Sequence, residues 1–533
     1  MTQSRRFRTH SGLGLLSMLL IVGAACTDND SSGVGGNQGP DGPADQGPAL
    51  LPRVDGDATA GRAVFRFETF NNERFWTDAA RMPAGMVAAG VTPRQLLALG
   101  VNVDADALPP ALKTSIAAGS ASVLDDPAMV IALLNANAVV GLPVKDSNGD
   151  GILDVSKGDK VGATCALCHT RTDEGAIFSV AGGGSVGARL DGRATHNLNF
   201  GKLVAAAANT RALYPLLQLS LAANGGKSLG RAPTGLTGTS TEAEVDAYLS
   251  NPAYYPVGMF DDTFDGNGDP MHNSALFRQD LAAPYGSEGT IARLDNFSNL
   301  VYTGLLDPTN LTTPGGRAFL AKLGGTAGTE IANTYVQVLA ATGVTGYPYI
   351  TAAASPLAGM EDAPLGNRVD NTKLINMNAY LVSLQAPPST GGDASGRNAF
   401  TTSGCTACHN VDQGRKVPTF IVPMKTIFPG DAPEQLATRT PPLNPVLNTA
   451  ASIFDDKMAV VNASIRSDIR GTALPLLLDL AKKPNFLHDN SVPSLEALLD
   501  GSRGATAPHP FYVSKADTRA SIIAYLRGVS TSP

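Results

Sequence analysis

The chain has 533 residues, of which 43% are hydrophobic, so it is long enough for about two or three domains with buried cores. Its formal net charge is −7, which excludes the basic surface typical of nucleic-acid-binding proteins. Beyond the first 25 residues, no segment approaches the roughly twenty apolar residues of a membrane-spanning helix.

The first 25 residues have the pattern of a lipoprotein-type signal peptide. Three arginines precede an apolar run at residues 13–25 that is short for a membrane span. Gly23-Ala24-Ala25-Cys26 resembles a bacterial lipobox, in which the cysteine becomes the lipidated first residue of the mature protein. Gly23 replaces the usual Leu, so cleavage without lipidation is the alternative. We predict a protein of the bacterial periplasm or outer membrane, attached to the membrane only through a lipid anchor on Cys26.

A polar segment follows the predicted cleavage site. Residues 27–49 are mostly Gly, Pro, Asp, Asn, Ser and Gln, with almost no large apolar side chain. Such a composition buries too little apolar surface to offset the entropy of folding. We therefore predict a disordered tether over residues 26–56; a disordered stump without function is the alternative.

Four amphipathic helices are predicted to form two similar pairs. Residues 57–70 and 395–400 each contain the pattern Gly-Arg-x-x-Phe, whereas residues 371–385 and 516–529 each contain Ala-Tyr-Leu. The sequence contains two C-x-x-C-H motifs, at residues 165–169 and 405–409. The first helix pair encloses the first motif, and the second pair encloses the second. The Pro- and Gly-containing residues 386–393 between the pairs have the composition of a linker.

Residues 146–154 match the first nine positions of an EF-hand-type calcium loop, with Gly at position six. The twelfth position is Lys157 rather than Glu, so a bidentate ligand must come from elsewhere; a bare turn is the alternative. Residues 265–269 repeat the start of this pattern, but Pro270 follows, and a polar turn explains them equally well. The predicted calcium ligands are Asp146, Asn148, Asp150 and Asp154.

Two motifs, Cys165-Ala166-Leu167-Cys168-His169 and Cys405-Thr406-Ala407-Cys408-His409, predict two covalently attached c-type haems. Two thiols at this spacing can form thioethers with the two vinyl groups on one edge of a porphyrin, and the following histidine can bind the iron. A zinc site built from the four cysteines is the alternative, but it leaves both histidines without a role. We predict haem attachment at Cys165, Cys168, Cys405 and Cys408, and iron ligation by His169 and His409.

The predicted fold is mainly α-helical, with two cytochrome c-like domains. The first covers residues 57–385 and carries a large loop-rich insertion with short helices; residues 386–393 link it to a compact second domain at residues 394–533. Loops of such length usually have a function or an ion that orders them.

The second axial ligand of each iron decides the function. A haem with both axial positions filled carries electrons, whereas an open position can bind oxygen or peroxide. In the N-terminal domain His272 is the first choice for the distal side and His196 the second, and a role other than ligation is the alternative for each. Met377 lies in a predicted helix and is expected to pack in the core. The remaining N-terminal candidates are Met259, Met271 and Met360; those in the C-terminal domain are Met424, Met458, His488 and His509.

The segment Phe486-Leu487-His488-Asp489-Asn490-Ser491-Val492-Pro493-Ser494-Leu495 resembles the F-x-H-D-G-S-V-x-x-L segment of bacterial di-haem cytochrome c peroxidases and their relatives, which include rubber oxygenases. The resemblance implies that His488 lies at or beside the second haem, as an iron ligand or a catalytic group. Asn490 replaces the family Gly, which a left-handed turn tolerates. A surface histidine before a capping Asp is the alternative.

A second resemblance covers only the start of the folded part. Residues 65–70 together with residues 73–76 resemble a group of exported di-haem c proteins whose function cannot be transferred. In the di-haem peroxidases a Trp after the first haem motif relays electrons between the haems. Here the single tryptophan, Trp76, precedes that motif, which weakens the peroxidase interpretation.

Two functions remain. The first is an electron-transfer protein of the cell envelope with a redox partner protein of unknown identity. The alternative is a di-haem oxidoreductase, peroxidase- or oxygenase-like, in which the N-terminal haem reacts and His272 and His488 are the catalytic candidates.

Overall fold

The computed structural model describes residues 55–217, 236–252, 255–260, 271–282, 285–286, 291–389, 394–407, 409, 421–423, 471–473, 476–486, 492–503 and 513–529. The predicted signal peptide with Cys26, nearly all of the predicted tether, the 265–269 turn, Cys408, Met424, Met458, His488 and His509 lie outside these residues.

The described residues are mainly helical, which confirms the predicted fold class at that level. Short 3-10 and π turns supplement the helices. The α-helices are α1 (Ala58–Phe67), α2 (Met82–Ala88), α3 (Pro93–Ala98), α4 (Pro110–Ala117), α5 (Ala121–Leu124), α6 (Ala128–Asn135), α7 (Ala166–His169), α8 (Phe200–Val204), α9 (Glu242–Ser250), α10 (Leu294–Leu300), α11 (Pro314–Ala341), α12 (Asn371–Ser383), α13 (Ala394–Thr402), α17 (Leu495–Leu498) and α18 (Ala516–Gly528).

The strands are two or three residues long and form small sheets. In the three-stranded sheet β1-β6-β5, β1 is parallel to β6 and β5 is antiparallel to it; the other sheets are antiparallel pairs. The strands are β1 (Val103–Asp104), β2 (Val144–Lys145), β3 (Lys160–Val161), β4 (Thr170–Arg171), β5 (Phe178–Ser179), β6 (Ser185–Gly187), β7 (Leu190–Asp191), β8 (Met259–Phe260), β9 (Met271–His272), β10 (Ala353–Ala354), β11 (Asn367–Arg368), β12 (Ile421–Pro423) and β13 (Gly471–Ala473).

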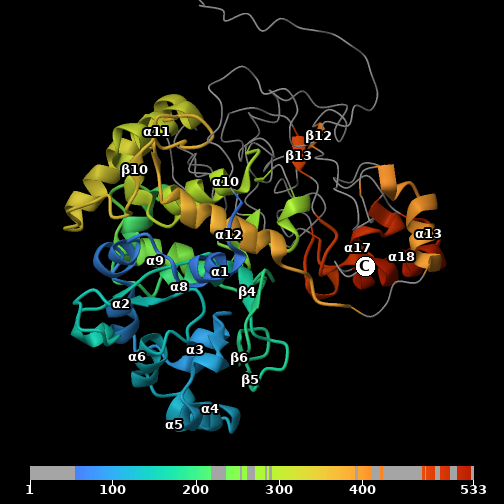
Figure 1. Cartoon of the computed structure of the whole chain (residues 1–533), viewed down its shortest axis with the longest axis horizontal. Coiled ribbons are helices and arrows are strands. Elements are labelled where there is room, and N and C mark those ends of the chain that lie inside the picture. The colour runs from blue at the N-terminus through green and yellow to red at the C-terminus, as the bar shows by residue number, and fades with distance from the viewer. Residues whose placement is uncertain are drawn as a thin grey trace, which may run out of the picture. The chain divides into compact units, whose positions relative to one another are not determined.

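Helices α1 and α12 lie side by side and confirm the first predicted helix pair (Figure 1). The carboxylate of Asp57 caps α1 by accepting hydrogen bonds from the first-turn amides. Gly61 allows the close contact, because a Cβ at this position would lie 1.9 Å from the carbonyl oxygen of Asn376 in α12. Phe65 packs against Tyr380 with their ring centroids 5.8 Å apart. The small residue and the aromatic residue of the pattern therefore both serve this helix contact.

The second predicted pair is also observed. Helices α13 and α18 pack together, and α17 packs against α18, as Figure 1 shows near the C-terminal end of the chain. Phe400 of α13 and Tyr525 of α18 have ring centroids 6.0 Å apart. Phe400 thus occupies the place in α13 that Phe65 occupies in α1.

Three hydrophobic cores hold the described residues together. The largest contains Trp76, whose side chain is 2% exposed. The second contains Phe65 of α1 and Met377 of α12 and extends to Ala166 beside the first cysteine motif. The third combines residues of the C-terminal part with Phe277. All described residues fall in one compact unit, so the division into two domains stays a prediction.

The predicted insertion differs from the structure in one respect: it contains the 28-residue helix α11. Glycines disfavour helices because they lose more backbone entropy, which explains why this segment was expected to form loops. Here they allow close backbone contacts, since a Cβ on Gly315 would lie 2.2 Å from the carbonyl oxygen of Leu365. A Cβ on Gly328 would lie 1.8 Å from the carbonyl oxygen of Leu320 in the same helix, so α11 bends back sharply between them.

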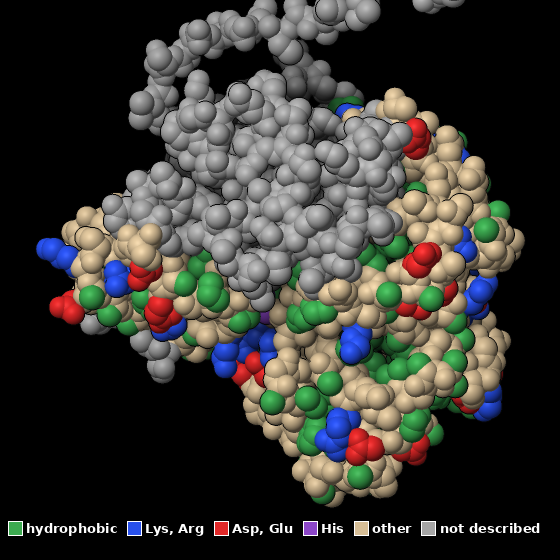
Figure 2. Space-filling view, turned by 180° about the vertical axis from the view of Figure 1, so that it is seen from behind, with side chains coloured by type: hydrophobic (Ala, Val, Ile, Leu, Met, Phe, Trp, Pro, Cys, Tyr) green, Lys and Arg blue, Asp and Glu red, His purple; other side chains and the backbone are tan. Residues whose placement is uncertain are grey.

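The described surface carries charges of both signs. On the face drawn in Figure 2, Lys and Arg side chains are interspersed with Asp and Glu side chains rather than gathered in one large patch. None of the helices in the described ranges combines the length and apolar character needed to cross a membrane.

We expect Gly61→Ala to destabilise the chain by about 1–3 kcal/mol, because the added methyl group forces α1 away from α12. Arg62→Ala in the same helix is the matched control, since Arg62 is exposed. Denaturant unfolding measures both variants. Equal stability of the two variants would contradict the role of Gly61 in the helix contact.

Candidate haem site

The first cysteine motif forms a single helical turn. Cys165 precedes α7, and the amide of His169 donates to the carbonyl of Cys165 over 3.2 Å. Gly141 packs directly against this turn. Its φ is +77°, and a Cβ there would lie 2.1 Å from the amide nitrogen of Leu167. Glycine is required here both by the left-handed backbone and by the contact with α7.

The thiols of the first motif are unpaired and both are accessible to a group that lies against α7. Neither Cys165 nor Cys168 forms a disulfide, and both are half-buried. The Cys165 thiol lies 3.8 Å from the Tyr302 hydroxyl. Burial raises the pKa of Cys165 to about 11 and that of Cys168 to about 12, so both are protonated thiols at neutral pH.

The imidazole of His169 is held in one tautomer. Its Nδ1 lies 2.8 Å from the backbone carbonyl oxygen of Ser274. Because a carbonyl oxygen can only accept, Nδ1 carries the proton and the lone pair is on Nε2. Burial lowers the pKa of His169 to about 4, although the Ser274 carbonyl opposes this shift, so the ring is neutral at physiological pH. A neutral imidazole with a free Nε2 and a backbone-bound Nδ1 is the arrangement of a metal-ligating histidine.

The loop that includes β7 binds the backbone carbonyl groups of the last two residues of the motif, Cys168 and His169. The amide of Gly192 donates to the carbonyl of His169 over 2.8 Å, and the amide of Thr195 donates to the carbonyl of Cys168 over 2.9 Å. The Thr195 hydroxyl donates to the same Cys168 carbonyl over 2.9 Å. The last carbonyl groups of this short turn, which a helix leaves unpaired, are therefore satisfied by the loop.

Asp191 joins this loop to the two helices that flank the motif. Its buried carboxylate accepts hydrogen bonds from Arg66 of α1 over 2.5 Å, from Tyr380 of α12 over 2.6 Å and from Thr170 over 2.8 Å. Thr170 directly follows His169 in the chain. No pattern in the sequence indicated that Asp191, Ser274 and Tyr302 are site residues.

The second motif repeats this local geometry as far as it is described. Cys405 is 6% exposed, and the amide of His409 donates to the carbonyl of Cys405 over 3.0 Å. The ring centroid of His409 lies 6.5 Å from that of Phe400 in α13. Cys408 lies outside the described residues.

The residues of the first motif fit a covalently attached haem. The first motif has two protonated thiols next to a neutral histidine whose Nε2 is free, with apolar side chains from α1 and α12 around it. Among the described residues, which do not include Cys408, no group of three His, Cys, Asp or Glu side chains could hold a metal ion. A haem needs only one protein histidine on this side of the iron.

The structure places His272 next to the motif, but on the side of Ser274. Lys483 donates to Nε2 of His272 over 2.9 Å, because the ammonium group has no lone pair to accept with. Ser274, two residues later, accepts a hydrogen bond from Nδ1 of His169. Distal ligation by His272 stays a prediction.

His196 lines an open cavity of about 450 Å³. Burial lowers its pKa to about 3, with Lys483, Arg171 and His169 acting in the same direction, so the ring is neutral. The cavity is also lined by Arg171, Asp173 and Lys482. Ligation by His196 therefore requires no deprotonation at neutral pH, and it stays a prediction.

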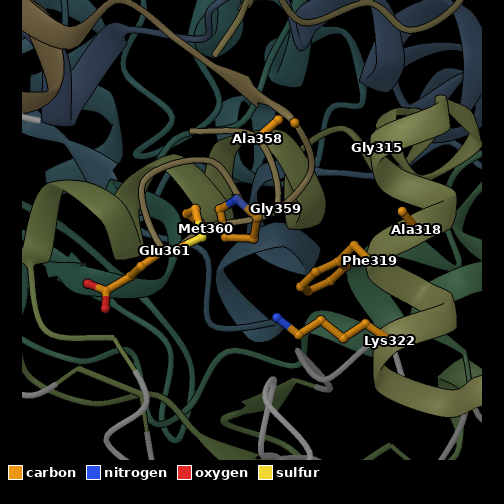
Figure 3. Close-up of a pocket in the computed structure, with 10 residues that line it drawn as sticks. Gly315, Ala318, Phe319, Lys322, Ala358, Gly359, Met360 and Glu361 are labelled. Carbon is orange, nitrogen blue, oxygen red and sulfur yellow. The ribbon is translucent and has the colours of Figure 1, made fainter. Parts of the chain in front are cut away.

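The methionine candidates are dispersed. Met377 is fully buried in α12, and its sulfur lies 3.9 Å from the Tyr302 hydroxyl, consistent with core packing. Met259 is 1% exposed in β8. Met360 lines a different cavity, of about 260 Å³, where Phe319 and Lys322 project from α11 (Figure 3). The described residues of the two haem motifs do not line that cavity. The side chain of Met271 is not among those described.

The predicted calcium loop is a hydrogen-bonded turn. The two carboxylate oxygens of Asp146 accept from the amides of Gly149 and Gly151, over 2.6 and 2.9 Å. Asn148 and Asp150 also accept backbone amides, and Lys157 pairs with Asp154 at 3.2 Å. These contacts order the loop through its own side chains, and calcium binding there stays a prediction.

Comparisons with known proteins assign no family. No family model matches the chain, and no curated relative matches it. Among solved structures, a chain of the hydrazine synthase of Kuenenia stuttgartiensis, pressurized with xenon, is similar over 50% of this chain and 74% of that chain. The sequence identity is 12% and the TM-score is 0.23. A similarity of this size establishes neither a fold family nor a function.

We expect Gly141→Ala to disturb the haem motif specifically. Gly175→Ala is the control, because Gly175 also has a positive φ, +67°, but a Cβ there meets nothing within 4 Å. Gly175→Ala should lower the free energy of unfolding by about 1–2 kcal/mol through backbone strain alone. Gly141→Ala should lower the free energy of unfolding by about 1–3 kcal/mol more than Gly175→Ala, because its methyl group collides with Leu167.

Urea unfolding and the haem absorbance per chain measure this difference. We expect Gly141→Ala to lower both quantities and Gly175→Ala to lower stability alone. Equal losses in the two variants would contradict a supporting role of Gly141 beneath α7.

Proposed function

We propose that this chain is a di-haem c-type cytochrome that transfers electrons in the bacterial cell envelope. The observation that carries the proposal is the hydrogen bond from Nδ1 of His169 to the carbonyl of Ser274, directly after two unpaired thiols. That bond leaves the lone pair on Nε2, where it can bind a metal. When bound, a c-type haem supplies one-electron redox chemistry at its iron.

In this proposal the chain's own residues fix the site before electron transfer begins. The thiols of Cys165 and Cys168 would hold the haem through two thioether bonds, formed by addition of each S–H group to one vinyl group with no atom released. The Ser274 carbonyl raises the basicity of His169 and prevents rotation of its ring. The loop that holds Cys168 and His169 limits movement of the motif, so little reorganisation accompanies a change of charge.

The proposed arrangement comprises two cytochrome c-like domains, at residues 57–385 and 394–533. Supporting it, α1 and α12 flank the first motif as α13 and α18 flank the second, and each pair carries one buried Phe. Lipid anchoring through Cys26, calcium at residues 146–154 and a separate redox partner protein belong to the same proposal.

We expect the exported protein to retain haem in a denaturing gel, because thioether bonds survive denaturation. Replacing Cys165 and Cys168 together by Ala should remove one of two haems, and replacing Cys405 and Cys408 should remove the other. Arg62→Ala is a control that leaves both motifs intact, since Arg62 is exposed. A wild-type chain without haem staining would contradict the proposal.

We expect both irons to be low-spin and six-coordinate, with absorption spectra that do not change on addition of cyanide or peroxide. Electron paramagnetic resonance and visible absorption measure this. A high-spin signal, or a spectral shift with either ligand, would favour the alternative, a di-haem oxidoreductase with one reactive haem. The same spectra of a His272→Ala variant and a His196→Ala variant would identify which ring, if either, binds the first iron.

A further inference from the structure

The Arg193 guanidinium is buried between the two parts of the chain that carry the haem motifs. Its side chain is 2% exposed. Nε and one terminal nitrogen donate to the two carboxylate oxygens of Asp479, over 2.8 and 3.0 Å, and the other terminal nitrogen donates to Glu174 over 2.8 Å. Such two-pronged pairs fix direction as well as distance. Residues 286 positions apart in the sequence are thereby held in one geometry.

On one side, Arg193 belongs to the loop that grips the first motif. Its neighbour Gly192 donates to the carbonyl of His169, and Thr195 donates to the carbonyl of Cys168. A Cβ on Gly192 would lie 2.8 Å from the ring of Phe277, so this loop has no room to shift toward that ring. The backbone hydrogen bonds of Gly192 and Thr195 therefore couple the position of Arg193 to that of the first motif.

On the other side, Asp479 begins a short turn at Leu480–Lys482 that packs against α18. Leu480 lies in the same hydrophobic core as Cys405 and Phe400. The carboxylate of Asp479, 11% exposed, is thus anchored to the core that contains the first cysteine of the second motif.

Two further contacts run in the same direction. Lys483 donates to His272, which lies two residues before the carbonyl that binds His169. Phe277, from the same segment as His272, is 1% exposed and belongs to the core that contains Cys405. The ion pair, the Lys483 contact and the Phe277 side chain all connect segments that hydrogen-bond the first motif to the C-terminal part.

We propose that Arg193 and Asp479 are positioning residues that fix the geometry between the two haem motifs and thereby the rate of electron exchange between the haems. This inference rests on the proposed function. A buried ion pair adds little net stability over an apolar contact, but it penalises every arrangement that separates the charges. Apolar contacts alone would allow the N-terminal and C-terminal parts of the chain to slide past each other. A small displacement of this kind would change the distance over which an electron moves between the haems.

The test compares two equally buried ion pairs in the fully loaded protein. Asp479→Asn and Arg193→Lys weaken the proposed tie, and the second keeps the positive charge but loses the two-pronged bond. Asp104→Asn is the matched control, because Asp104 pairs with Arg189 at 2.6 Å, the two side chains are 12% and 3% exposed, and both lie before residue 217.

Two readouts apply to all variants: the distribution of iron–iron distances from pulsed dipolar electron paramagnetic resonance, and the rate of electron equilibration between the haems after rapid one-electron reduction. We expect a broader distribution and several-fold slower equilibration in Asp479→Asn and Arg193→Lys. Asp104→Asn should lose stability but keep both values of the wild-type protein. If Asp479→Asn does not accumulate, Arg193→Lys carries the same comparison.

A narrow, unchanged distance distribution in loaded Asp479→Asn or Arg193→Lys would overturn the inference and leave the proposed function intact. Equal broadening in Asp104→Asn would overturn it as well, because the effect would then reflect general destabilisation. A wild-type chain without covalent haem would instead refute the proposed function, and the positioning role with it.

Discussion

The hydrogen bond between Nδ1 of His169 and the carbonyl of Ser274 is the constraint on which the candidate site depends. It selects the tautomer, orients the ring and leaves Nε2 available for a metal. Because Ser274 accepts through its main-chain carbonyl, the geometry of this hydrogen bond depends on the backbone position of the segment that contains Ser274. Much of the surrounding structure acts to fix that segment and the facing α7 turn.

The supports reach the site from several parts of the chain. Gly141 lies beneath α7, the loop from β7 satisfies the carbonyls of Cys168 and His169, and Asp191 ties that loop to α1 and α12. The Arg193 and Asp479 pair extends the same support toward the second motif. Rigidity of this kind suits electron transfer, in which the protein should change little between charge states.

The sequence predicted those parts of the site that depend on local spacing. The paired helices at residues 57–70 and 371–385 follow from apolar periodicity, and the thiols and histidine of each motif follow from chemistry within five residues. Ser274 could not be predicted, because a carbonyl acceptor 105 residues away leaves no side-chain pattern. Asp191 was visible only as one acid in a polar loop. Helix α11 was missed because its glycines, which disfavour an isolated helix, here permit tertiary contacts.

Intact-protein mass spectrometry tests the central claim most directly, on chain produced in a bacterium that matures c-type cytochromes. We expect a mass that exceeds that of the mature polypeptide, with its lipid where Cys26 is acylated, by two haems, whatever the distal ligands are. A mass equal to that of the polypeptide, with or without bound zinc, would contradict it.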